Sequence, residues 1–235
     1  MPRFLTEFME ALPSETPFVG PEALERQHGQ GFLARLGANE SVFGPSPKAV
    51  AAMASGLEDV SLYADPEHWD CRTKLAAHHG LTPNHIMMGE GIDGLFGVLA
   101  RLVCDHQTKV VTSAGAYPTF VFQMVNNGAE IIRVPYRDDH EDPEALLQSV
   151  GTYGAKLCYL SNPDNPMGSW ILAKDILNML DKMPEECLLV LDEAYQDFAP
   201  ADALLPNNFT HPQLLRFRTF SKAHGLAGLR VGYVF

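Results

Sequence analysis

The sequence has few cysteines, few tryptophans and few basic residues, and each shortage excludes a class of protein. Its 235 residues include 17 Lys and Arg against 29 Asp and Glu, a formal net charge of −12. Nucleic acid is therefore excluded as a partner, because binding to phosphates along a duplex needs a basic face. No apolar run reaches the roughly 20 residues of a membrane-spanning helix. The acidic N-terminus also lacks the apolar stretch of a secretory signal, so no membrane contact is predicted.

The cysteines do not form a disulfide or zinc framework. They lie far apart and contain no CxxC pair, which predicts reduced thiols in the core of a cytoplasmic protein. None of the nine histidines has the spacing of a metal site, so no metal is predicted. We expect the pair His78-His79 on a solvent-facing helix surface and Trp69 and Trp170 in the core. The four cysteines are Cys71, Cys104, Cys158 and Cys187.

What the chain does have is a regular alternation of apolar runs and helical stretches from residue 85 onward. Strands separated by helices predict βαβ units, and therefore an α/β fold with a mostly parallel, seven-stranded sheet. The strand centres are apolar throughout, which indicates helices on both faces of the sheet. The expected strands are 85–88, 109–113, 130–135, 156–160, 188–191, 214–217 and 231–235. The expected helices are 93–104, 118–127, 142–150, 171–182 and 223–228, and earlier ones begin at Pro47 and near residue 67.

The segment Gly89-Glu90-Gly91-Ile92-Asp93-Gly94 matches the pattern GxGxxG between a strand and a helix. A dinucleotide fold would use it for a pyrophosphate and would place an acid at the end of the next strand, where only Ser113-Ala114-Gly115-Ala116 stands. It can also hold a single phosphate on backbone N–H groups at a helix N-terminus, or be only a tight turn.

Polar groups follow several later strands. Lys222 stands between the hydroxyls of Thr219 and Ser221 and Arg230, a set that suits a phosphate dianion. Asp192 ends an apolar strand three residues before Tyr195, and Asn165 lies in a rigid Asn-Pro turn after another. Because parallel strands bind ligands at their carboxyl ends, these groups are candidates for one site. Each taken alone is also compatible with a surface cation, a helix cap or a plain turn.

The order of these pieces, ending in the Ser221-Lys222 and Gly228-Leu229-Arg230 elements, resembles the fold-type I class I/II aminotransferases, which depend on pyridoxal 5'-phosphate. The resemblance runs from Ala38-Asn39-Glu40 to Val234 and is greatest to the histidinol-phosphate aminotransferase branch. It implies an N-terminal arm and substrate-side segment over 1–60 and the large, cofactor-binding domain over 61–235. It further implies that the family's small C-terminal domain, roughly a hundred residues, is missing from this chain.

The resemblance also assigns roles to residues. Lys222 would form a Schiff base with the cofactor and then move a proton at the substrate's α-carbon. Asp192 would keep the pyridine nitrogen protonated, and Asn165 and Tyr195 would hydrogen-bond the ring oxygen. Catalysis would thus rest on Lys222, Asp192 and Tyr195. The remaining cofactor-binding residues would be Tyr117 on the ring face and Gly91, Ile92, Asp93, Thr219, Ser221 and Arg230 at the phosphate.

The implied function is transfer of an amino group between an amino acid, or histidinol phosphate, and a 2-oxo acid. The implied assembly is a homodimer with shared active sites, in which Tyr63 reaches the phosphate in the partner subunit. Residues 37–43 would line the substrate side. Three alternatives stay open: a fragment that binds cofactor without turnover, a decarboxylase or lyase of the same fold, and, more distantly, an NAD-dependent dehydrogenase.

Overall fold

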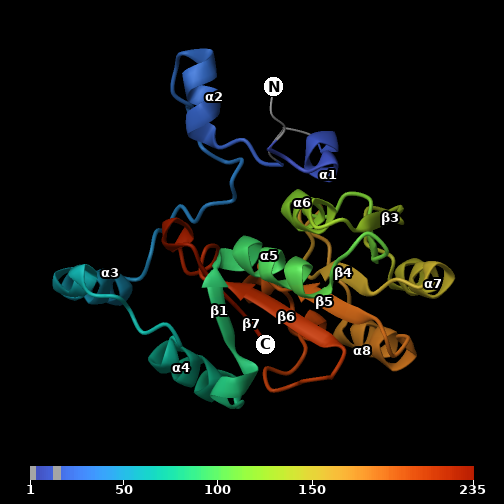
Figure 1. Ribbon diagram of the computed structural model, residues 1–235. Coiled ribbons are helices and arrows are strands. Elements are labelled where there is room, and N and C mark those ends of the chain that lie inside the picture. Colours follow the sequence, from blue (N-terminus) through green and yellow to red (C-terminus); the bar gives the residue numbers. More distant parts are fainter. Residues whose placement is uncertain (1–3, 13–16) are drawn as a thin grey trace.

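The computed structural model describes residues 4–12 and 17–235, and its centre is one mixed sheet (Figure 1). The strand order is β1-β7-β6-β5-β4-β2-β3. The five strands from β2 to β6 are parallel, whereas β7 runs antiparallel to both of its neighbours. The strands are β1 Met87–Glu90, β2 Lys109–Ser113, β3 Glu130–Val134, β4 Leu157–Ser161, β5 Leu188–Asp192, β6 Leu214–Thr219 and β7 Val231–Val234.

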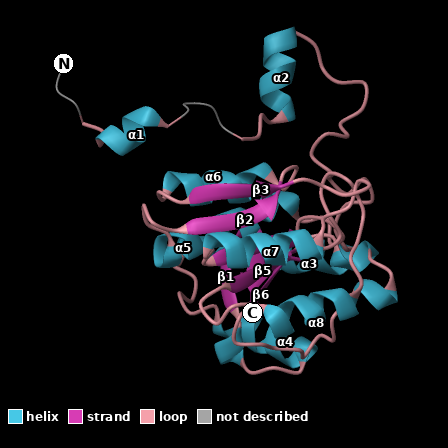
Figure 2. Cartoon of the chain, turned by 90° about the vertical axis from the view of Figure 1, so that its right-hand side faces the viewer, coloured by secondary structure: helices cyan, strands magenta, loops and turns pink. Residues whose placement is uncertain are grey.

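Helices cover both faces of this sheet, as the apolar strand centres predict (Figure 2). Side chains along a strand alternate between faces, so Val110 packs in one apolar cluster and Val111 in the other. One cluster holds α5 and α6, and the other holds α7 and α8. These helices are α5 Gly91–Val103, α6 Pro118–Asn126, α7 Pro143–Tyr153 and α8 Ala173–Lys182. The fold is therefore the expected α/β sandwich of a buried sheet between helical layers.

The strands β2 and β4 separate towards their carboxyl ends. Their ladder contains only two residue pairs, Val110 with Leu157 and Val111 with Cys158, although both strands continue to other partners. A buried carboxyl group, that of Glu141, fills the gap: it accepts from the Ser113 hydroxyl at 2.8 Å. It also accepts from the backbone N–H of residue 161 at 3.0 Å. The strand that follows β2 in the chain, β3, lies on one side of it, whereas β4 lies on the other side. The gap between β2 and β4 is therefore a topological switch point, where ligands bind in such sheets.

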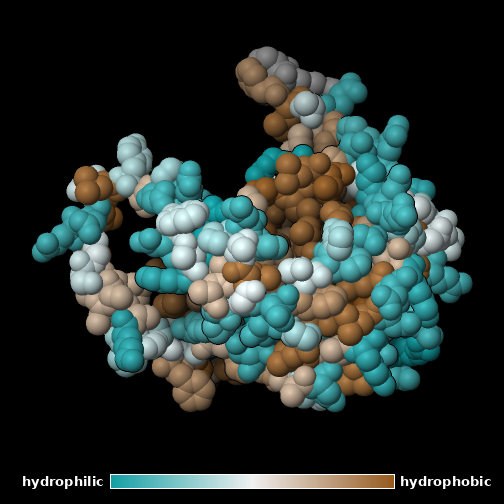
Figure 3. Space-filling view, turned by 90° about the horizontal axis from the view of Figure 1, so that it is seen from below, coloured by the Kyte–Doolittle hydropathy of each residue, from teal (hydrophilic) through white to brown (hydrophobic). Residues whose placement is uncertain are grey.

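Most of the chain before residue 80 extends away from the sheet (Figure 1), although Ala76 and His79 are buried against Tyr233. It contains α1 Glu7–Ala11, α2 Pro21–His28, α3 Pro47–Ser55 and α4 Trp69–His79, and the first three bury no residue. Most of the large hydrophobic side chains that are exposed lie in this part. On the face seen from below in Figure 3, hydrophobic residues are also exposed among hydrophilic ones. No helix in the described ranges is long and apolar enough to cross a membrane.

Several local expectations differ from the structure. The expected helix 223–228 is wrong: a single 3-10 turn, Ala227–Leu229, stands there, because Gly225 and Gly228 interrupt the short segment. His79 is buried rather than solvent-facing, since α4 packs it against Tyr233, whose hydroxyl lies 3.0 Å from Nε2. Burial lowers the pKa of His79 to about 4.

Three residues expected in the core are exposed. Trp69 and Trp170 are 52% and 49% exposed, and Cys71 is exposed on α4. Trp69 and Cys71 belong to the extended N-terminal part, where little of the chain packs on the helix, so an apolar side chain there finds no core. The thiols of Cys158 and Cys187 are buried as expected, and Cys104 is half-buried.

Candidate functional site

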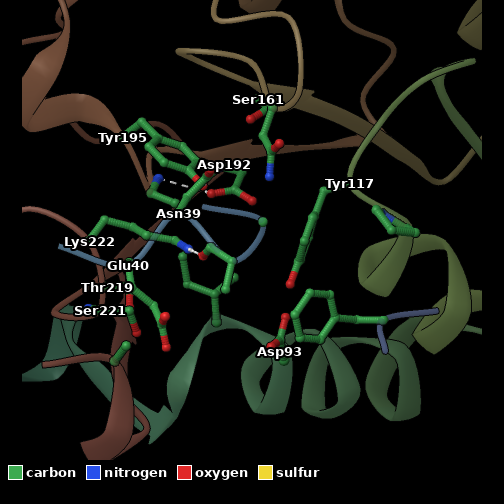
Figure 4. A pocket seen from close by; sticks show the side chains of 18 of the residues that line it. Asn39, Glu40, Asp93, Tyr117, Ser161, Asp192, Tyr195, Thr219, Ser221 and Lys222 are labelled. Carbon is green, nitrogen blue, oxygen red and sulfur yellow. Dashed lines mark hydrogen bonds between the residues drawn. The ribbon is translucent and has the colours of Figure 1, made fainter. Parts of the chain in front are cut away.

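A cavity of about 550 Å³ lies at the carboxyl ends of β4, β5 and β6 (Figure 4). The start of α5 and the loop before α6 form one side, and residues 37–40 cross it from the N-terminal part. Its size falls in the range of ~300–1,000 Å³ typical of small-molecule sites. Predicted site residues that line it are Ile92, Asp93, Tyr117, Asn165, Asp192, Tyr195, Thr219, Ser221, Lys222 and Arg230.

The carboxylate of Asp192 lies at the buried end of this cavity. The strand β5 ends there, so its last side chain emerges at the sheet edge with only 4% of its surface exposed. Tyr159 Oη donates to Oδ2 at 2.8 Å, and the N–H of Ala194 donates to Oδ1 at 3.0 Å. Burial outweighs these bonds and raises the pKa of Asp192 from 3.8 to about 6. A buried carboxylate of this kind is best satisfied by a cation.

Glu193, the next residue, forms a separate buried ion cluster. It accepts from Arg216 at 2.8 and 3.0 Å and from Arg218 at 2.9 Å. Both arginines come from β6, so the cluster ties the end of β5 to its neighbour. It fixes the backbone at the point where Asp192 enters the cavity.

Lys222 enters the cavity from the loop that follows β6. Its ammonium donates to the carbonyl of Ala38 at 2.9 Å and lies 5.6 Å from the centre of the Tyr195 ring. The lysine is half-buried and faces the same space as Asp192. Its amine is therefore accessible to a small molecule in the cavity.

The end of the cavity opposite Asp192 suits an anion. The 13-residue helix α5 begins at Gly91, and its N-cap residue forms no side-chain cap, so N–H groups of the first turn remain available. A Cβ at Gly91 would lie 2.7 Å from Arg230 Nη2, so the guanidinium packs directly on the helix start. Arg230 also contacts Asp93 at 3.2 Å. The Thr219 hydroxyl donates to that of Ser221 at 2.9 Å at the same end.

Tyr117 faces Lys222 and Asp192 across the cavity (Figure 4). Burial raises the pKa of this phenol to about 12, so it remains neutral at ordinary pH. The Tyr117 ring stands on one side of the cavity and Lys222 on the other. The face of such a ring can stack on a planar ligand.

Two predicted residues do not line the cavity. Gly91 lies under Arg230, where its φ of 71° and the nearby guanidinium both disfavour a side chain. Tyr63 is fully exposed and apart from the site. Phe18 and Tyr159 were not predicted from the sequence, because no motif marks them: Phe18 lines the cavity and Tyr159 bonds Asp192. Ser161, the first residue of the predicted Asn-Pro turn, also lines the cavity. No cluster of metal-ligating side chains occurs within the described ranges.

Comparison with known proteins agrees with this geometry. The sequence family described as aminotransferase class I and II matches residues 33–235. The chain belongs to that family. It is 34% identical over 232 residues to the histidinol-phosphate aminotransferase of Staphylococcus epidermidis, covering 96% of this chain and 65% of the relative.

Solved structures of other proteins have the same fold. The histidinol-phosphate aminotransferase of Sinorhizobium meliloti, solved with pyridoxal-5'-phosphate, superposes with a TM-score of 0.94 at 50% identity, over 99% of this chain and 62% of that one. An L-threonine-O-3-phosphate decarboxylase from Porphyromonas gingivalis shares the fold alone, with a TM-score of 0.69 at 22% identity. The chain thus has the fold-type I architecture and spans less than two thirds of the length of these relatives.

Proposed function

We propose that this aminotransferase chain binds pyridoxal 5'-phosphate and transfers an amino group between an amino acid and a 2-oxo acid. The observation that carries the proposal is the single cavity that joins Lys222, the buried Asp192 and the anion site at the start of α5. The lysine, the carboxylate at one end of the cavity and the phosphate site at the opposite end match the three functional parts of this cofactor. The structure solved with that cofactor supports the proposal.

The residues present fit the cofactor chemically. The first turn of α5, Thr219, Ser221 and Arg230 would hold the phosphate, and Tyr117 would stack on the ring. Asp192 would keep the pyridine nitrogen protonated, since that cation is the partner its buried carboxylate needs. When bound, the cofactor supplies an electron sink for the carbanion that forms at the α-carbon of the substrate.

The protein's own groups would do the rest of the chemistry. Lys222 would hold the cofactor through its amine and, once that amine is free, carry the proton removed from the substrate's α-carbon. Tyr195 and Asn165 would bond the ring oxygen. The relatives named histidinol-phosphate aminotransferases suggest histidinol phosphate as one amino donor, with a 2-oxo acid as acceptor.

We also propose a homodimer with shared active sites, divided into an arm over residues 1–60 and a cofactor-binding domain over 61–235. Support comes from the exposed hydrophobic residues of the N-terminal part, which a second copy would cover. Tyr63, fully exposed, would then reach the phosphate site of the partner subunit. A cytoplasmic location stays a prediction.

The cofactor assignment is tested by adding pyridoxal phosphate to the purified chain. We expect a visible absorption band that borohydride bleaches, leaving the cofactor's mass on the peptide that contains Lys222. Lys222→Ala should abolish both. The matched control is Lys182→Ala, an exposed lysine at the end of α8, which should leave both unchanged. Absence of the band at saturating cofactor would reject the assignment.

The reaction is tested separately, on the loaded chain. Adding an amino acid or histidinol phosphate should convert the band to the amine form of the cofactor and release the matching oxo product. Loaded chain that converts no donor binds cofactor without turnover. Release of carbon dioxide or of an elimination product would instead identify a decarboxylase or lyase.

A further inference from the structure

A short segment that precedes α3 contacts the centre of the site. The carbonyl of Ala38 accepts from Lys222 Nζ at 2.9 Å, and Asn39 Nδ2 donates to Tyr195 Oη at 2.9 Å (Figure 4). Further along, a side chain at Gly225 would collide with the carbonyl of Gly44, so the segment also packs on the loop after Lys222. The segment is therefore fixed on both sides of the contact between Asn39 and Tyr195.

The backbone at Asn39 is left-handed, with φ 51°. Residues other than glycine rarely adopt this conformation, and asparagine is among those that tolerate it best. The turn directs the amide of Asn39 to the phenol of Tyr195, while the neighbouring carbonyl reaches Lys222. The residue type at this position thus serves both the backbone and the contact.

The direction of the hydrogen bond matters for chemistry. An amide NH₂ group only donates, so the phenol oxygen of Tyr195 accepts and keeps its own proton for another acceptor. Accepting one bond also polarises the O–H group and strengthens it as a donor. Tyr195 lines the cavity beside Lys222 and Asp192, and its free proton can be donated there.

We propose that Asn39 is a positioning residue that makes Tyr195 a donor to the ring oxygen of the bound cofactor. The inference rests on the proposed function. Its consequence concerns the proton shared between that ring oxygen and the nitrogen of Lys222. The stronger the bond from Tyr195, the lower the pH at which this proton leaves.

The test is a pH titration of the visible band of the loaded chain. Removing the donor in Asn39→Ala should raise the midpoint by about half a pH unit, the size of one modest hydrogen bond. Asn39→Asp should raise it further, because a carboxylate accepts the Tyr195 proton and withdraws it from the cavity. The matched control is Asn127→Ala, an asparagine outside the cavity lining whose amide donates to the carbonyl of Gln123, and it should leave the midpoint unchanged.

A second titration separates this role from a general effect on the site. In a Tyr195→Phe background, Asn39→Ala should no longer shift the midpoint. A shift that persists there, or Asn39 variants that titrate like the wild type, would overturn the inference while leaving the cofactor assignment intact. A wild-type chain without the band would overturn the proposed function itself. Circular dichroism melts show that each variant compared is folded.

Discussion

The most informative single residue is Asp192. Burying its ionised carboxylate costs folding free energy, and the proposed cofactor would remove that cost. Its pKa is about 6 in the folded chain, against 3.8 for the ordinary side chain. The folded chain therefore holds this proton more tightly than the unfolded chain. The free energy of unfolding therefore falls by about 3 kcal/mol, for a difference of two pKa units, as the pH rises from about 4 to about 6. Above that pH this contribution is level.

Asp192→Asn should remove this pH dependence. In urea unfolding without cofactor, the wild type should lose about 3 kcal/mol relative to the variant between pH 4 and pH 7. The amide oxygen can accept from the Ala194 N–H, and the Tyr159 hydroxyl can rotate to accept from the NH₂ group, so the fold is kept. The same variant should bind pyridoxal phosphate more weakly, since no negative charge faces the pyridine nitrogen. Parallel pH profiles for the two proteins would contradict the assignment of this cost to Asp192.

Among the elements, the contact between β7 and the start of α5 decides the geometry of the anion site. A Cβ at Gly232 would lie 2.8 Å from the carbonyl carbon of Gly91 and 2.9 Å from the N of Ile92. Both are backbone atoms, which cannot turn aside as a flexible side chain can. The strand therefore needs glycine at this point for α5 to begin where it does.

Gly232→Ala should push the start of α5 out of place. We expect a loss of about 1–3 kcal/mol in urea unfolding, as for other overpacked positions. We also expect weaker binding of pyridoxal phosphate, measured by titrating the visible band. The matched control is Gly151→Ala, in the exposed part of α7 with nothing within 4 Å of the added carbon. It should stabilise by up to about 1 kcal/mol and leave cofactor binding unchanged. Equal affinities for both variants would reject this role of Gly232.

The sequence predicted which elements form better than how they meet. The strands β2 to β6 follow from apolar runs between helices, and Asp192 and Lys222 follow from the rule that parallel strands bind ligands at their carboxyl ends. The antiparallel β7 and its contact with Gly91 could not be predicted, because pairing between distant strands leaves no periodic signal. The carboxyl of Glu141 between β2 and β4 was missed for the same reason. His79 was misplaced because its partner, Tyr233, comes from the far end of the chain.

At the scale of the whole molecule, the N-terminal part buries the least of its apolar surface within the chain. Its exposed apolar side chains include Leu57, Val60 and Leu62, which lead up to the fully exposed Tyr63. Removing such an apolar surface from water is favourable, and a symmetric dimer would bury the same patch on both copies at once. The segment that carries Asn39 into the cavity belongs to this part, so the proposed dimer would link association to the site through one stretch of chain.

The proposed dimer predicts a complementation between two variants that no single variant can show. Lys222→Ala should form no band, and Tyr63→Ala should bind pyridoxal phosphate weakly. If Tyr63 serves the partner subunit, a mixed dimer of the two variants contains one site with both residues and one site with neither. Random exchange of subunits should therefore restore tight binding in about a quarter of all sites, because half of the dimers are mixed. Cofactor titration after unfolding and refolding the two variants together measures this fraction. A mixture that titrates as the sum of its separate components would mean that Tyr63 does not act across a dimer interface.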